Sequence, residues 1–236
     1  MNTQETLTSI LSRLDDQEQV QLLGILRQKF PIHQLETDWN IPAEFILQAI
    51  AESQDITKRG VRSIIAELCF NTYILGPMAD NYWTHIRQVG DLPYDALIEH
   101  PTIGRIKIQT KNQRLVKGVP LLANGPMVKN NPEVEGWYVC ETQKTRTGKD
   151  KNQLDTRPYR FGEFDILSVC LHPSTGDWTK FIFSPAHTLI PKKGSPELIA
   201  TFQPLPPTRQ GNWTDSLEEA IEWHLEKRTY TPGTLI

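Results

Sequence analysis

The chain has 236 residues, of which 38% are hydrophobic, and its net charge is −3, so it is long enough to bury one large core. No apolar stretch reaches the roughly 20 residues that a membrane-spanning helix needs, and the polar amino terminus lacks the pattern of a signal peptide. The three cysteines (Cys69, Cys140 and Cys170) are scattered, which predicts reduced thiols in a cytoplasmic protein and argues against a structural zinc site.

Charge is distributed unevenly along the chain. Residues 1–55 carry three Lys/Arg against nine Asp/Glu, whereas residues 101–161 carry twelve against five. The second segment therefore has a net charge of +7 within an acidic protein. Such a segment is suited to a local surface that binds a phosphate backbone, although a solvated charged surface is the plain alternative.

The first third of the chain is predicted to be helical. Hydrophobic spacing and helix-end signals indicate three helices: residues 7–30 with a break near Asp15, residues 42–53, and a helix from a Thr57 cap to the Gly76-Pro77 pair. The last two are separated by a short polar turn. A DNA-reading helix-turn-helix and ordinary core packing are both compatible with that pair.

The middle of the chain changes to strand patterns. We expect strands over residues 82–89, 95–100, 105–111, 136–141, 164–171 and 178–183, and a last helix from Ser216 to Arg228 capped by Thr214 or Asp215. The strand at 164–171 is nearly all apolar, which is typical of a strand buried on both faces. The pattern predicts an α/β (α+β) fold with a mixed central β-sheet flanked by helices.

Three regions are expected along the chain. Residues 1–58 form an N-terminal helical region packed on the core, residues 59–190 form the core, and residues 191–236 form a Pro-rich segment with the C-terminal helix.

The most informative segment is the hairpin predicted from the strands at 95–100 and 105–111. In its second strand Lys107, Gln109 and Lys111 alternate with apolar residues and so point to one face. With the turn centred near Thr102, Asp95 lies opposite Gln109, with their Cβ atoms roughly 5 Å apart. The hairpin therefore brings a carboxylate, an amide oxygen and an ammonium group together.

Such a group of side chains suits the hydrolysis of a phosphodiester. Mg²⁺ prefers hard oxygen ligands, which Asp95, Gln109 and the backbone carbonyl of Thr110 offer. Lys111 carries the positive charge that holds a phosphate or orients the attacking water. Glu67, on the helix before the strands, is positioned to add a second carboxylate.

These residues resemble a known group of enzymes. Glu67 on a helix, Leu92-Pro-Tyr-Asp95 at the start of a strand, and Ile-Gln-Thr-Lys111 in the next strand are similar to the motifs of the PD-(D/E)XK nuclease superfamily, which includes type II restriction endonucleases. The resemblance covers residues 60–185 and implies a restriction-endonuclease-like core that cleaves DNA with Mg²⁺.

The resemblance also implies roles for individual residues. Asp95 takes the place of the motif's aspartate, Gln109 that of its second acidic residue and Lys111 that of its lysine. Gln109 departs from the usual Asp or Glu, as it does in Mrr-like nucleases, and leaves the site with one carboxylate fewer. Glu67 becomes correspondingly more important for holding the metal.

The predicted partner is double-stranded DNA, with no membrane association, and the predicted enzyme is a homodimeric type II restriction endonuclease of a prokaryotic cytoplasm. Candidate phosphate contacts are the basic residues of the segment that begins at the hairpin: Lys107, Arg114, Lys144, Arg146, Lys149 and Lys151. Two alternatives remain open. One is a weakly active or inactive nuclease fold that only binds DNA, and the other is a repair or transposition nuclease.

Overall fold

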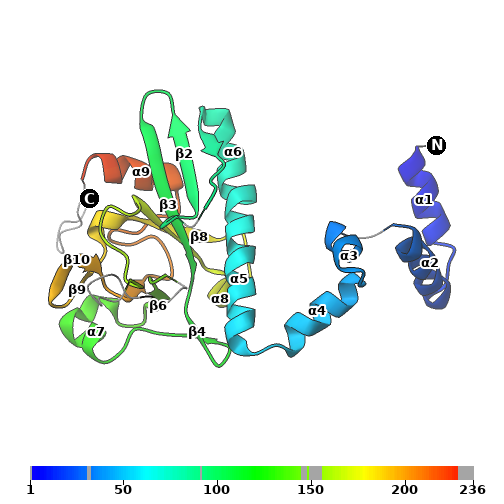
Figure 1. Cartoon of the computed structure of the whole chain (residues 1–236), viewed down its shortest axis with the longest axis horizontal. Coiled ribbons are helices and arrows are strands. Elements are labelled where there is room, and N and C mark those ends of the chain that lie inside the picture. The colour runs from blue at the N-terminus through cyan, green and yellow to red at the C-terminus, as the bar shows by residue number, and fades with distance from the viewer. Residues whose placement is uncertain (1, 31–32, 91, 145–147, 149–155, 228–236) are drawn as a thin grey trace. The chain divides into compact units, whose positions relative to one another are not determined.

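The computed structural model describes the chain apart from residues 1, 31–32, 91, 145–147, 149–155 and 228–236 (Figure 1). It divides into two compact units, residues 1–61 and residues 62–236, with the boundary inside one helix. Each unit is described by itself.

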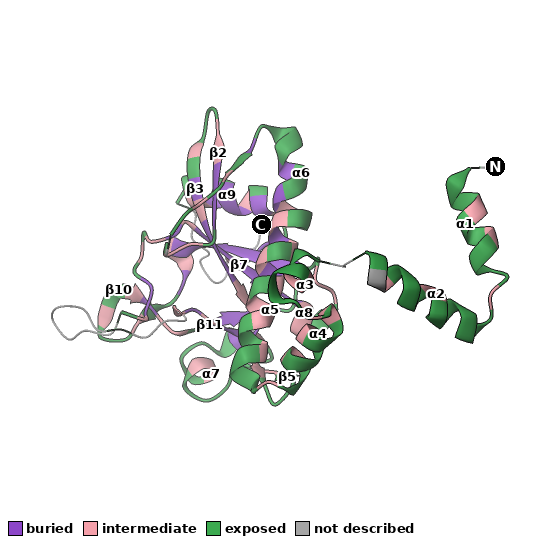
Figure 2. Ribbon diagram, turned by 45° about the vertical axis from the view of Figure 1, so that its right-hand side comes forward, coloured by how far each residue is buried: buried purple, intermediate pink, exposed green. Residues whose placement is uncertain are grey.

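The first unit is helical. Its helices are α1 (Thr3–Leu11), α2 (Asp16–Lys29), α3 (Gln34–Trp39), α4 (Ala43–Glu52) and the start of α5 (Asp55–Cys69). The expected break near Asp15 is confirmed: Asp15 caps α2 by accepting a 2.8 Å hydrogen bond from the backbone nitrogen of Glu18. No described side chain of this unit is buried, as the green and pink ribbons of Figure 2 show.

The predicted end of the third helix at Gly76-Pro77 is wrong. After α5 the chain continues through a π-helical turn, η1 (Phe70–Leu75), then α6 (Gly76–Met78) and the 3₁₀ turn η2 (Ala79–Asn81). Pro77 lies in the first turn of α6. Backbone N–H groups in the first turn of a helix have no acceptor within the helix, so the N–H that proline lacks is not needed there. Thr57, the predicted cap, lies inside α5.

A five-stranded mixed sheet forms the centre of the second unit, in the order β1-β2-β3-β7-β8. Its strands are β1 (Thr84–Ile86), β2 (Ala96–His100), β3 (Gly104–Asn112), β7 (Ile166–Cys170) and β8 (Phe181–Pro185). Neighbouring strands are antiparallel except for the parallel pair β3 and β7. The predicted α+β class with a mixed central sheet is thereby confirmed.

The register of the β2–β3 hairpin also agrees with the prediction. Ala96 pairs with Ile108, so that Asp95, one residue earlier, stands opposite Gln109. The backbone nitrogen of Asp95 donates to the carbonyl of Ile108 at 3.0 Å and continues the ladder by one residue. Gly104 closes the turn with a φ of +91°, a value that a residue without Cβ adopts at no steric cost.

Different elements pack against the two faces of the sheet. On one face Ile106, Ile108 and Ile166 pack against α5, η1 and the C-terminal helix α9 (Leu217–Leu225). On the other face Leu167 and Val169 pack against a cluster of loops and short strands. Figure 2 shows the buried sheet strands in purple between these layers.

The strand predicted at 136–141 exists as β6 (Tyr138–Glu141), but it pairs with β11 (Phe202–Leu205) rather than with the central sheet. β11 falls in the segment predicted as Pro-rich coil, and its Pro204 needs no N–H at the edge of a two-stranded ribbon. β7 is buried throughout, as expected, and β8 is buried throughout as well.

Shorter elements connect these parts: β4 (Leu115–Val116), β5 (Val119–Pro120), α7 (Pro126–Asn130), η3 (Pro132–Val134), α8 (His172–Thr175), η4 (Ala186–Thr188), β9 (Pro191–Lys192) and β10 (Ser195–Ile199). The cap of α9 is Ser216, whose hydroxyl accepts from the backbone nitrogen of Glu219 at 3.2 Å, and not Thr214 or Asp215. Among the described residues, no helix is long and apolar enough to cross a membrane.

Candidate active site

Asp95, Gln109 and Thr110 meet at the start of β2. The carboxylate oxygen Oδ2 of Asp95 accepts a 2.8 Å hydrogen bond from the backbone nitrogen of Thr110 and another from the Nε2 of Gln109. The same Nε2 donates to the carbonyl oxygen of Thr110 at 3.2 Å. The amide group of Gln109 therefore connects two of the other predicted metal ligands, the Asp95 carboxylate and the Thr110 carbonyl.

Gln109 is held in this position by burial, since only 2% of its surface is exposed. Asp95 as a residue is exposed, yet its carboxyl group is enclosed enough for the loss of hydration to raise its pKa. The charge of Lys111 and the hydrogen bond from Thr110 act in the opposite direction.

Lys111 extends from the same strand to the ring of Tyr159. Its Nζ lies 5.3 Å from the ring centre. Burial alone lowers the pKa of Lys111, but Tyr159 and Asp95 together outweigh that effect and the net pKa is raised. Lys111 therefore keeps its positive charge at neutral pH.

Glu67, on α5, interacts electrostatically with Asp95 and Lys111. Its pKa is raised to about 7, first because the carboxyl group is partly buried and then because the Asp95 carboxylate repels its charge. Lys111 partly offsets both effects. Two carboxyl groups with raised pKa values next to each other are a common property of sites that bind a cation or handle a proton.

The residues present fit a divalent cation of the Mg²⁺ type. Asp95 Oδ2 and the Thr110 carbonyl oxygen converge on one hydrogen-bond donor, and Glu67 supplies a second carboxylate whose repulsion by Asp95 a cation would relieve. Mg²⁺ in proteins is held by one or two carboxylates and keeps several waters. In the described part of the chain no group of three or more His, Cys, Asp or Glu side chains is placed to hold a metal ion.

The basic residues proposed to contact phosphate have different surroundings. Lys144 Nζ lies 5.4 Å from the same Tyr159 ring and forms a 2.7 Å ion pair with Glu163. Lys107 Nζ donates to the carbonyl of Gly162 at 2.8 Å, and Arg114 is paired with Glu141. The remaining three candidates, Arg146, Lys149 and Lys151, lie outside the described residues.

Sequence reasoning missed Tyr159, which links Lys111 to Lys144. Tyr159 is 48 positions beyond Lys111, and no short motif connects them. It also missed Gln113, which directly follows β3 and is only 3% exposed. The polar alternation of β3, continued by two positions beyond Lys111, points to Gln113.

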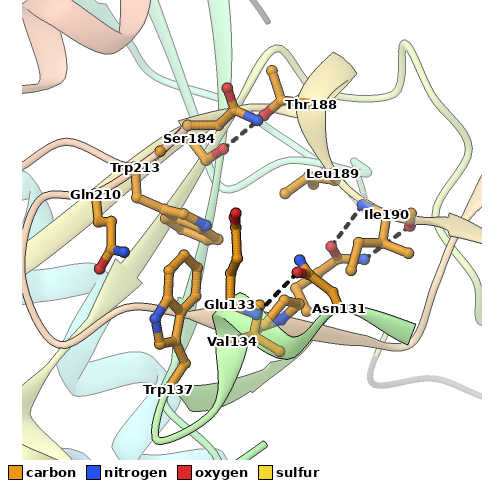
Figure 3. A pocket seen from close by; sticks show the side chains of 14 residues that line it. Asn131, Glu133, Val134, Trp137, Ser184, Thr188, Leu189, Ile190, Gln210 and Trp213 are labelled. Atoms are coloured by element: carbon orange, nitrogen blue, oxygen red, sulfur yellow. Dashed lines mark hydrogen bonds between the residues drawn. The ribbon is translucent and has the colours of Figure 1, made fainter. Parts of the chain in front are cut away.

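A separate cavity of about 210 Å³ is lined in part by Trp137, Trp213 and Leu189 (Figure 3). Several polar side chains that line the cavity are already hydrogen-bonded to neighbouring segments of the chain. The hydroxyls of Ser184 and Thr188 bond each other at 2.9 Å, and Gln203 bonds the backbone of Ile190 in both directions. We assign no chemistry to this cavity.

No known family model matches the chain, and no curated protein matches its sequence. Among solved structures, the chain is similar to the bacterial homing endonuclease I-Ssp6803I, with a TM-score of 0.36 and 18% sequence identity over 64% of this chain and 80% of that one. Because this similarity is low, we base the functional proposal on the residues of the site.

Proposed function

We propose that this chain is a Mg²⁺-dependent endonuclease that hydrolyses phosphodiester bonds of double-stranded DNA, as a member of the PD-(D/E)XK superfamily. One observation carries the proposal: Asp95, Gln109 and the Thr110 carbonyl converge on one point of a hairpin whose next residue is the charged Lys111. Within this class we favour a type II restriction enzyme.

The roles follow from the positions of the residues. Asp95, Gln109, the Thr110 carbonyl and Glu67 would hold Mg²⁺, which when bound would activate a water molecule and stabilise charge on the phosphorus. Lys111 binds a non-bridging phosphate oxygen with its ammonium group. A cation bound between Glu67 and Asp95 would relieve the repulsion between the two carboxylates that contributes to the raised pKa of Glu67.

For Gln109 to act as a ligand its amide must present Oε1 instead of Nε2. The nitrogen and oxygen ends have the same shape, so a half-turn of the amide exchanges them within the same space. The change replaces the two donated hydrogen bonds by ligation to the cation.

A homodimer is the assembly that we favour for this enzyme. Cleavage of both strands of a duplex needs two active sites, and a two-fold axis between copies matches a palindromic site. We expect the homodimer to persist at nanomolar concentration and to be detected by sedimentation velocity.

The direct test is cleavage of unmodified plasmid and phage DNA with Mg²⁺ and with EDTA. We expect Mg²⁺-dependent cutting at discrete sites, and a loss of at least about 100-fold in rate for Asp95→Ala and for Lys111→Ala. Lys180→Ala, which changes an exposed lysine in the loop before β8, is the matched control. Undiminished cleavage by the two site variants would overturn the assignment.

A second candidate is a protein of the same fold that binds DNA without cutting it. The observation in its favour is that Gln109 donates a hydrogen bond to Asp95 and leaves the site one carboxylate short. Retention of duplex DNA in a gel shift, with no cleavage of any tested sequence in Mg²⁺ or Mn²⁺, would support this candidate. Gain of cleavage by Gln109→Glu would then identify the missing carboxylate as the cause.

A further inference from the structure

The side chain of Tyr159 contacts lysines from two segments that are far apart in the sequence. The ammonium group of Lys111, on the hairpin, lies 5.3 Å from its ring centre, and that of Lys144, after β6, lies 5.4 Å from it. Cations near an aromatic ring are attracted by its electron density, more strongly where water is scarce. Two lysines 33 positions apart in sequence are thus brought around one side chain.

The ring itself is fixed. Only 4% of the surface of Tyr159 is exposed, and its ring packs edge-on against Phe164 with 5.3 Å between the centroids. Its carbonyl oxygen accepts a 2.8 Å hydrogen bond from the backbone nitrogen of Ile199. Since a lysine side chain loses much rotational freedom when it is ordered, a rigid partner that orders it in advance lowers the cost of binding an anion.

Each of the two ammonium groups has a carboxylate near it. Lys111 is balanced by Asp95 and Lys144 by Glu163, at 2.7 Å from its carboxylate. A divalent cation on Asp95 would draw that carboxylate away from Lys111. Lys111 would then be free to bind the scissile phosphate, and a neighbouring phosphate of the same backbone would be within reach of Lys144.

We propose that Tyr159 is a positioning residue of the nuclease site, which holds Lys111 toward the scissile phosphate and Lys144 toward the DNA backbone beside it. The inference rests on the proposed function for its substrate. It adds Tyr159 to the site and makes Lys144 a phosphate contact that works together with Lys111.

The first test removes only the hydroxyl. Tyr159→Phe keeps the ring and is expected to slow single-turnover cleavage about 10- to 100-fold while the Kd for DNA, measured with Ca²⁺, changes less than about threefold. Tyr138→Phe, at a residue packed against the same core cluster, is the control and is expected to cleave at the wild-type rate.

The second test asks whether Tyr159 acts through Lys144. Lys144→Ala should weaken DNA binding and reduce the slope of log K against log salt by about 1. In a Tyr159→Leu background the same change should have no further effect, because the lysine has already lost its support. Fully additive effects of the two changes would overturn the coupling.

A third measurement separates this inference from the nuclease assignment. NMR of ¹³C-methylated lysines reports the contact of Lys111 with the Tyr159 ring, through the ring-current shift of its methyl groups, without DNA or cleavage. If the wild-type protein cuts no DNA but Tyr159→Leu removes the ring-current shift of Lys111, the nuclease proposal fails and the contact stands. If Tyr159→Leu leaves both that shift and the cleavage rate unchanged, Tyr159 has no positioning role.

Discussion

Gln113 is a buried amide without a partner. It is 3% exposed, and both its Nε2 and its Oε1 lack a hydrogen bond in the described part of the chain. An unpaired buried polar group costs about 1–3 kcal/mol, which an apolar side chain of similar shape avoids. We therefore predict that Gln113→Met raises the free energy of unfolding by about 1 kcal/mol, and Tm by about 2–4 °C, in calorimetry.

Gln203 is the matched control for Gln113. It is equally buried, but its amide makes three hydrogen bonds of 2.8–3.0 Å to the backbone of Ile190 and Ala200. Gln203→Met should therefore lower stability, by about 1–3 kcal/mol. A loss of stability in both variants would show that Gln113 has a partner, such as an ordered water, in the free protein.

Glu67 makes stability depend on pH in a definite direction. Its pKa is about 7 in the folded chain against 4.5 for the unperturbed group, so between these values the folded state binds the proton more tightly. The resulting stabilisation is complete below pH 4.5 and is lost as pH rises through 7. We predict that the Tm of Glu67→Gln, relative to wild type, increases from pH 5 to pH 8.

Mg²⁺ is expected to reverse this trend. A cation that binds the ionised carboxylates stabilises the folded chain, so an excess of Mg²⁺ should raise the Tm of wild type at pH 8. Asp95→Asn should lose that increase. An equal Mg²⁺ effect in both proteins would place the cation elsewhere.

At the scale of elements, α9 depends on its cap. Ser216 supplies the hydroxyl that satisfies the backbone nitrogen of Glu219, and the helix then buries Leu217, Ala220 and Ile221 in the core. Ser216→Ala is predicted to cost about 1 kcal/mol in denaturant unfolding. The neighbouring Asp215→Ala, at an exposed position, should stay within about 0.5 kcal/mol of wild type, and a larger loss there would make Asp215 the cap.

The β2–β3 hairpin was predictable because one turn and an alternating pattern fix its register. The opposite positions of Asp95 and Gln109 follow from them without knowledge of the rest of the chain. β6 was predictable as a strand but not in its partner, since β11 lies some 60 residues later and contains Pro204. The contact of Lys111 with Tyr159 could not be predicted for the same reason, because packing between distant segments leaves no local sequence pattern.

At the scale of the whole molecule, the two units differ in what they bury. The described part of the first unit has no buried side chain, whereas β3 and β7 of the second unit lie in its core. Whether residues 1–58 pack on the core remains a prediction. Hydrogen exchange of the full chain tests it.

We predict that amides of β3 and β7 are protected by about 5 kcal/mol or more, and that those of α1–α4 exchange by local opening at much lower cost. Protection of α1–α4 equal to that of β3 would show that these helices are covered, by the core or by a second copy. Repeating the measurement at several protein concentrations separates the two.

The central claim is that Asp95, Gln109 and the Thr110 carbonyl hold a divalent cation for phosphodiester cleavage. Anomalous scattering from crystals soaked in Mn²⁺ tests it most directly, because Mn²⁺ takes the same oxygen ligands as Mg²⁺ and its position is observed rather than inferred. We predict an anomalous peak bound to Asp95 and to the Thr110 carbonyl, with Gln109 no longer donating to Asp95, and no peak in Asp95→Asn. A peak remote from Asp95, or none in the wild-type protein, would contradict the claim.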